Sequence, residues 1–310
     1  MLKILRIKII MEILQKKKIA RFKESLIQTF FMTNATLAVM ILVGIFILLA
    51  WSAIPAFKEI NFVKFMTGVN WDPTSPVKEE YGILSMVVST FMVTFGALVI
   101  AIPIGIGVAA YLSDVAHPRT REIIKPVVEV LAGIPSVVVG FLGIVLFGPL
   151  IAHLFHLPNG LNALNGSVLL AIMALPTIIS ISEDSLKSVP LSYQQASLAL
   201  GASRWETLVR IKIPAALSGI IASIMLGMGR AIGETMTVLM ATGNASAFPH
   251  GFLSSIRTMT ATIAIELGEV PYFTTHYYAL FGVGLVLFII TFLVNLSADL
   301  ILHRYQEREQ

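Results

Sequence analysis

Two opposite charges, Arg230 and Glu234, stand inside an otherwise uncharged apolar stretch. A spacing of four residues places both side chains on one face of a helix, where they can pair. A charge near the centre of a bilayer costs about 2.5–3.5 kcal/mol, so such residues usually face a bundle interior or a water-filled path. The pair is therefore either a structural link between helices or part of an anion path. In such a path the planar donor fork of Arg230 would meet an oxyanion, and Glu234 would hold or release it.

A second candidate is the polar, basic segment 195–214, which interrupts the apolar pattern. Ser192–Gln195 and Ser203–Glu206 both fit the S-x-x-[QE] capping box that begins a helix. Gly201 lies between them, where a helix end favours a left-handed residue, and Pro214 closes the second helix. The pattern predicts an amphipathic hairpin too small to bury its own apolar side. We expect it to dock into a groove on another protein, with a position on lipid headgroups as the alternative.

The composition indicates that membrane spans carry these candidates. The chain has 310 residues, of which 56% are hydrophobic and 13% charged, and its mean hydropathy is +0.84. These values lie far outside soluble globular usage. The absence of cysteine excludes disulfides, Cys-ligated zinc and iron–sulfur clusters. Runs of about 20 apolar residues predict an all-α polytopic membrane protein with six transmembrane helices. The spans are expected at about 29–54, 83–112, 130–152, 167–182, 215–242 and 277–302.

The distribution of Lys and Arg predicts the orientation. Six spans place both termini on one side, and 17 of the 22 basic residues fall there, against four on the other side. Because cytoplasmic loops carry the excess of positive charge, we expect cytoplasmic termini in a cell-membrane protein. The net charge of +4 then requires no nucleic acid. The expected parts are a basic segment at 1–28, a permease domain at 29–302 with a cytoplasmic loop at 183–214, and a tail at 303–310.

The N-terminal basic region and the apolar run after it are both too long for a usual signal peptide. We therefore expect the first run to be a retained anchor. The basic segment before it would lie against anionic lipid headgroups.

The segment 195–214 resembles a cytoplasmic loop of permease subunits in bacterial and archaeal ABC importers, with the form E-A-A-x3-G-x9-I-x-L-P. The spacing matches at every anchor, although Gln, Ser and Ile replace Glu, Ala and Leu. In that family the loop is a coupling helix that sits in a cleft of the ATPase subunit. The resemblance implies that the residues coupling this chain to an ATPase are Gln195, Ala196, Ser197, Gly201, Arg204, Trp205, Glu206, Ile211 and Pro214.

The chain contains no Gly-Lys dipeptide, so it has no G-x-x-x-x-G-K-[ST] phosphate loop. An ATP-driven importer of this kind would need its ATPase on a separate chain. We therefore expect a transport subunit without enzymatic activity or a cofactor of its own. ATP and magnesium would be bound by the partner ATPase.

The stretch Gly229–Met236 resembles the phosphate importer permeases, and its form is more like the C-type subunit than the A-type. Segments 132–141, 174–176 and 255–269 also resemble that subunit, and the similarity runs from about 81 to 298. The resemblance implies a type I ABC importer permease fold and inorganic phosphate as the substrate. It implies as partners an ATPase dimer, a second, A-type permease and an extracytoplasmic phosphate-binding protein. Residue chemistry alone leaves sulfate, molybdate and tungstate open, and the charged pair alone would suit an ion-coupled secondary transporter.

Several weaker signals have two interpretations each. Pro135 and Pro176 predict kinks that either line the path or serve packing. His153 and His156 could share a helical face, but without a nearby carboxylate or thiol we expect an interfacial loop and not a metal site. The segment 254–267 has the spacing of an extracytoplasmic interfacial helix. It would either help form an outer gate and receive the binding protein, or simply cover the bundle.

Overall fold

The computed structural model describes residues 2–306 of the chain. The last four residues of the expected tail, 307–310, lie outside the described residues. By its internal contacts the chain divides into two compact units, Met1–Trp51 and Ser52–Gln310. Both candidate sites predicted from the sequence lie in the second unit.

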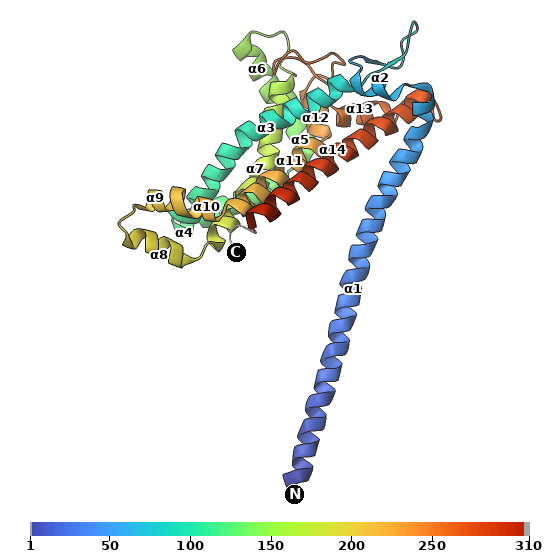
Figure 1. Cartoon of the computed structure of the whole chain (residues 1–310). Coiled ribbons are helices and arrows are strands. Elements are labelled where there is room, and N and C mark those ends of the chain that lie inside the picture. Colours follow the sequence, from blue (N-terminus) through green and yellow to red (C-terminus); the bar gives the residue numbers. More distant parts are fainter. Residues whose placement is uncertain (1, 307–310) are drawn as a thin grey trace. The chain divides into compact units, whose positions relative to one another are not determined.

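The first unit belongs to one continuous helix, α1 (Leu2–Glu59), whose last turns extend into the second unit (Figure 1). Its portion Glu24–Glu59 is long and apolar enough to span a membrane. No break separates the expected basic segment from the expected first span. Neither glycine nor proline interrupts residues 2–43, and these are the residues that most strongly end a helix. The basic segment and the first span therefore form one rod.

A short connection with a small hairpin follows α1. It consists of α2 (Phe62–Thr67) and two antiparallel strands, β1 (Trp71–Asp72) and β2 (Glu80–Tyr81). Gly68 and Gly82 cross so closely that a Cβ on Gly82 would lie 2.3 Å from the carbonyl carbon of Gly68. This approach requires glycine at the crossing. The hairpin is the only sheet among residues 2–306, so the all-α expectation is confirmed.

Among the described residues, five helices are long and apolar enough to cross a membrane, or six if a bent pair counts as one span. The bent pair is Arg204–Ala215 with Leu217–Gly233, at 69°. The expectation of six spans is thus confirmed only if this bent pair is counted as one span. The elements after β2 are α3 (Leu84–Ala110), the π-helical turn η1 (Tyr111–Val115), α4 (Pro118–Ala132), α5 (Ser136–Leu142), the π-helical turn η2 (Gly143–Phe147), α6 (Gly148–Phe155), α7 (Ala163–Ser188), α8 (Leu191–Ala199), α9 (Arg204–Thr207), the π-helical turn η3 (Leu208–Lys212), α10 (Ile213–Ala215), α11 (Leu217–Gly233), α12 (Met236–Ala241), α13 (Met259–Glu266) and α14 (Thr275–Gln306).

Three expected spans have different boundaries in the structure. The third, predicted at 130–152, begins at Ser136, because α4 ends at Ala132 and the extended Pro135 starts a new helix. The fourth, predicted at 167–182, extends over Ala163–Ser188. The Asn162 side chain caps its start, and its polar last turns continue the helix beyond the apolar part. The fifth, predicted as one helix over 215–242, is divided into α11 and α12.

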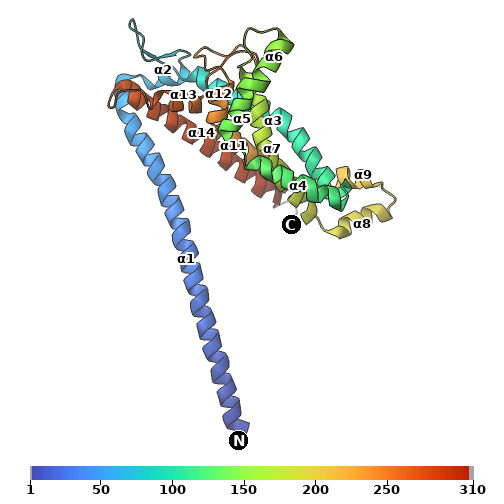
Figure 2. The ribbon, with the colours of Figure 1, turned by 180° about the vertical axis from the view of Figure 1, so that it is seen from behind.

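Helix α7 is the centre of the second unit and packs against α3, α11, α4 and α12. Close approach depends on small residues: a Cβ on Gly227 of α11 would lie 2.9 Å from Ile178 of α7, and one on Gly105 of α3 would lie 2.6 Å from the same side chain. Around this axis the helices divide into two ends, which both views show. Elements α4, α8, α9 and α10 lie at one end, and α2, α6 and α13 at the other (Figures 1 and 2).

Candidate functional site: the coupling hairpin and the broken helix

The first helix of the polar hairpin begins earlier than predicted. Helix α8 starts at Leu191 with Pro190 at its N-cap, and no side chain caps this end. The capping box predicted at Ser192–Gln195 is therefore wrong, since Ser192 already lies inside the helix. The reason is Pro190, which forces Val189 into an extended conformation that ends α7. The fixed φ of proline then starts the next helix.

The turn and the second helix follow the sequence prediction. Gly201 has a φ of +87°. Its N–H donates to the carbonyl of Leu198 at 3.0 Å, and the N–H of Ala202 donates to that of Ser197 at 3.2 Å, as in a Schellman motif. The capping box at Ser203–Glu206 is complete. Hydrogen bonds from Ser203 hold the pKa of the Glu206 carboxyl below its usual value. The box is therefore ionised and intact at neutral pH.

The hairpin exposes large apolar side chains. Leu200 is 90% exposed and Trp205 is 70% exposed, and Leu191 and Tyr193 are also open to the surface. Isolated exposed apolar side chains are common, but several on one short polar hairpin are typical of an interaction surface. This exposure fits docking to another protein.

The predicted coupling residues lie on this hairpin and the turn that follows it. Ser197 is half-buried, and its hydroxyl lies 2.9 Å from that of Thr207, which joins α8 to the end of α9. The other predicted coupling residues are exposed, and they are Gln195, Ala196, Gly201, Arg204, Trp205, Glu206, Ile211 and Pro214. Their contact with an ATPase stays a prediction.

The charged pair of the fifth span has a different geometry from the one expected. Helix α11 ends at Gly233, and Glu234 is extended, with a ψ of 130°. The two charges therefore do not share one helical face, and the expected ion pair is wrong: in the described part of the chain, no ion pair joins Arg230 to Glu234. The side chain of Arg230 is exposed.

Tertiary contacts hold the break open. The Thr260 hydroxyl donates to the Glu234 carbonyl at 2.9 Å, and the Thr237 hydroxyl donates to the Ser136 carbonyl at 3.1 Å. The Glu234 carboxylate lies 3.5 Å from the N–H of Thr237, at the start of α12. Irregular backbone at membrane depth is tolerated where protein groups or a cavity satisfy it. Broken helices line ion and substrate sites in transporters, and Arg230 lies about one turn before this break.

The segment predicted as an interfacial helix over 254–267 is shorter and lies deeper. Helix α13 covers only Met259–Glu266, and its first residues are buried. Thr258 caps it, Thr260 contacts the break, and the N–H of Met259 donates to the Thr90 hydroxyl of α3 at 3.2 Å. The alternating threonines at 258, 260 and 262 are the sequence signal that could have indicated this burial. Helix α13 thus supports the break through Thr260.

Sequence reasoning also missed a polar network at the end of the second unit opposite the hairpin, which we call the far end. The half-buried Glu266 accepts from Trp71 Nε1 at 2.9 Å, pairs with Arg257 at 2.7 Å, and lies 2.8 Å from His276 Nε2. Burial opposes ionisation of this carboxyl. The hydrogen bonds from His276 and Trp71, with the charges of His276 and Arg257, nevertheless hold the pKa of Glu266 below its usual value. This network ties β1, α13 and α14 together.

A comparable cluster lies near the hairpin end. The buried Glu183 of α7 is surrounded by Arg121 at 3.1 Å, Lys125 at 3.5 Å and Lys187 one turn along the helix. The i, i+4 spacing of Glu183 and Lys187 was its only sequence signal. The cluster fixes α4 to α7.

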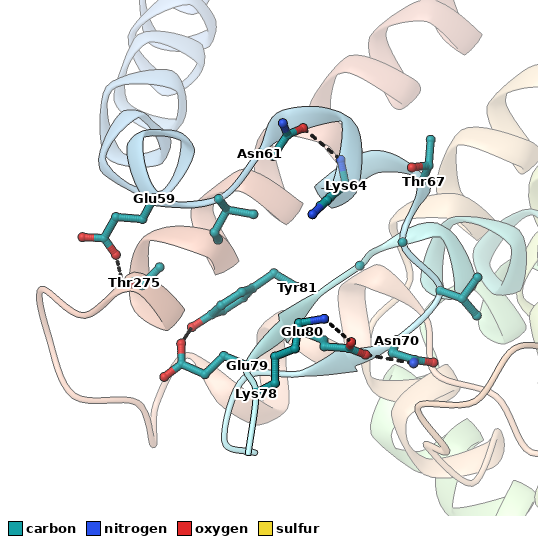
Figure 3. A pocket seen from close by; sticks show the side chains of 14 residues that line it. Glu59, Asn61, Lys64, Thr67, Asn70, Lys78, Glu79, Glu80, Tyr81 and Thr275 are labelled. Carbon is teal, nitrogen blue, oxygen red and sulfur yellow. Dashed lines mark hydrogen bonds and ion pairs between the residues drawn. The ribbon is translucent and has the colours of Figure 1, made fainter. Parts of the chain in front are cut away.

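A pocket of about 620 Å³ lies between α2 and the hairpin of β1 and β2 (Figure 3). Its charged groups largely satisfy one another: Glu80 accepts from Asn70 at 2.9 Å and Lys78 at 3.2 Å, and Tyr81 donates to Glu79 at 2.6 Å. One ion pair and two hydrogen bonds therefore brace the hairpin at this pocket. In residues 24–297, no group of three or more His, Cys, Asp or Glu could hold a metal ion, and His156 is left-handed at the end of α6, off the helical face of His153.

The sequence is similar to those of known transport proteins. A family model described as "Binding-protein-dependent transport system inner membrane component" matches residues 101–308. The chain is 37% identical to the "Probable ABC transporter permease protein YqgH" of Bacillus subtilis, over 76% of this chain and 75% of that protein. It is 34% identical to the "Phosphate transport system permease protein PstC 1" of Mycobacterium tuberculosis (77% and 81%) and 34% identical to PstC of Mesorhizobium japonicum (88% and 88%).

Solved structures share the fold. The inward-facing MetNI methionine ABC transporter is 20% identical and has a TM-score of 0.54, with 72% of this chain and 94% of that chain covered. A bacterial ABC transporter that imports alginate is 13% identical and has a TM-score of 0.59, with 92% and 99% covered. At these identities the similarity establishes the type I importer permease fold alone.

Proposed function

We propose that this chain, which belongs to the family of binding-protein-dependent transport system inner membrane components, is the permease subunit of an ATP-driven importer of inorganic phosphate. It is a multi-pass membrane protein without the phosphate loop of an ATPase. The phosphate assignment is supported by several relatives named phosphate transport permeases, at 30–34% identity over most of the chain. Sulfate, molybdate or tungstate is not favoured by these relatives.

The single observation that carries the proposal is the exposed hairpin of α8 and α9. Its apolar side chains need a partner, and the chain lacks the phosphate loop of an ATPase. An ATPase dimer, binding ATP and magnesium, is the partner that would satisfy both conditions. An ion-coupled secondary transporter would leave the hairpin without a role.

The excess of basic residues at the hairpin end supports a cytoplasmic position for that end and for both termini. The opposite end, with α2, α13 and the small hairpin, would then face outward and receive the phosphate-binding protein. The exposed Arg230 beside the break would face a path completed by a second, A-type permease. Closure of the ATPase would drive alternating access through the coupling hairpin.

The test is reconstitution of the chain with an ATPase, an A-type permease and a phosphate-binding protein in proteoliposomes. We expect phosphate uptake that requires ATP, and ATP hydrolysis that the phosphate-loaded binding protein stimulates. Uptake driven by an ion gradient without ATP, or a chain that binds no ATPase, would contradict the proposal. Stimulation by sulfate-loaded or molybdate-loaded binding protein in place of phosphate would correct the substrate.

A further inference from the structure

Among the described residues, a single polar side-chain contact joins the coupling hairpin (residues 191–212) to the rest of the bundle. In the described residues, the hairpin's other side-chain hydrogen bonds lie within it. The exception is Lys212, whose Nζ lies 2.6 Å from Oδ1 of Asp114. Both side chains are nearly buried, at 9% and 13% exposure. A buried ion pair of this geometry is short, charge-assisted and directional.

The ion pair lies beside a cavity. A cavity of about 480 Å³ lies between the hairpin and η1, and Leu198, Trp205 and Leu208 of the hairpin line it together with Asp114 and Lys212. Hairpin and η1 therefore face each other across open space, and the ion pair bridges it. An apolar contact through Leu208 also joins the hairpin to the ends of α3 and α7. Apolar contacts allow sliding, whereas an ion pair fixes one distance.

Both partners sit on π-helical turns. Asp114 belongs to η1 at the end of α3, and Lys212 is the last residue of η3. Such turns carry poorer backbone geometry than an α-helix and occur frequently at functional sites. Here each turn places its charged side chain toward the other. The second carboxylate oxygen of Asp114 is buried without a hydrogen-bond partner in the described structure, an acceptor that another arrangement of the hairpin can use.

We infer that Asp114 and Lys212 form a positioning pair that transmits movement of the coupling hairpin into α3. Helix α3 packs along the length of α7, which in turn holds α11 and its break. A displacement imposed on the hairpin by the ATPase would therefore reach the Arg230 region through α3 and α7. This inference rests on the proposed function, since it assigns the route by which ATP hydrolysis is coupled to transport.

The test uses the full reconstituted complex and the double variant Asp114→Asn with Lys212→Met. This variant removes the ion pair without leaving a lone buried charge, whose cost would obscure the result. Lys212→Arg keeps the charge and a carboxylate-matching donor fork. Lys187→Met is the matched control, because it removes a cation at the same end of the bundle that pairs within α7.

We expect the double variant to assemble with the ATPase and to retain basal ATP hydrolysis. Phosphate moved per ATP hydrolysed should fall about tenfold, the size of a typical coupling energy. Lys212→Arg and Lys187→Met should keep the wild-type ratio. An assembled double variant with the wild-type ratio would overturn the inference, as would a loss of assembly with an unchanged ratio in the complexes that remain. If the wild-type complex itself shows no phosphate-stimulated hydrolysis, the proposed function fails and not the route alone.

Discussion

The Glu266 network and the coupling hairpin lie at opposite ends of the second unit and use polar groups differently. Glu266 is held by three partners: Trp71 of β1, Arg257 of the loop before α13, and His276 of α14. At the hairpin end, one ion pair connects the hairpin to the bundle, and the large apolar side chains point outward. On the proposed function, the Glu266 network would belong to a fixed frame, and the hairpin would be held by a partner and would move. Substitutions in the Glu266 network should therefore lower stability, and substitutions in the hairpin should lower coupling.

The largest effect should follow Glu266→Ala. It leaves Arg257 half-buried without its carboxylate and frees the indole N–H of Trp71, so we expect a loss of about 3–5 kcal/mol in the free energy of unfolding. The measurement is unfolding of the purified protein in detergent. Glu80→Ala is the control, since solvent screens its surface pair with Lys78 and its loss should change stability little. Equal losses in both variants would remove the contrast between the two ends.

Arg230 tests the region between the ends. Arg230→Ala should reduce phosphate uptake by about a hundredfold, the loss expected when a charged donor to the anion is removed, while the complex still assembles. Arg230→Lys should recover part of the uptake, because it keeps the charge but loses the planar fork. Normal uptake by Arg230→Ala would exclude a role in the path. A complex that falls apart would support a structural role.

At the hairpin end, Trp205→Ala should leave the free energy of unfolding within about 0.5 kcal/mol of wild type, since the side chain is exposed. Its affinity for the ATPase should fall by about 2 kcal/mol or more, as for an aromatic anchor of an interface. Co-purification and titration of the ATPase measure this. Leu154→Ala, exposed on α6 at the other end, is the control and should bind normally. Unchanged affinity in Trp205→Ala would argue against docking through α9.

The smallest effect should be a dependence of stability on pH. The pKa of Glu266 is lowered in the folded protein. The stability that its carboxylate contributes is therefore fully present above the pKa of the unfolded chain, about 4.3. It is lost as the pH falls below that value and through the folded pKa. Thermal unfolding of wild type should thus decline more steeply below about pH 4.3 than that of Glu266→Gln. Parallel curves for the two proteins would show that Glu266 titrates normally.

Local features of the fold followed well from the sequence. The turn at Gly201 and the capping box at Ser203–Glu206 were predicted because each is encoded within a few neighbouring residues. The box at Ser192–Gln195 failed because Pro190, two residues earlier, had already started the helix. The extent of the spans was approximate, since hydropathy locates apolar runs but not helix ends.

The candidate site was only partly predictable. The positions of Arg230 and Glu234 were evident as charges in an apolar run, but their pairing was not correct. Whether the helix continues past Gly233 depends on a hydrogen bond to the Glu234 carbonyl from Thr260, 26 residues further along the chain. The local sequence around Glu234 does not indicate this partner. The network around Glu266 joins Trp71 to a residue 195 positions along the chain. The periodicity of apolar residues in the sequence does not indicate such distant partners.

The sequence by itself determined that this is a polytopic membrane protein, that a polar hairpin interrupts its spans, and that the chain carries no G-x-x-x-x-G-K-[ST] phosphate loop. Those conclusions rest on composition, short-range caps and a missing motif, which are readable without the fold. Only the tertiary structure decided that the fifth span is broken, that α13 is buried against the break, and that Lys212 meets Asp114 across 98 residues. The physical reason is that a broken backbone or a buried charge is stable only where distant groups satisfy it.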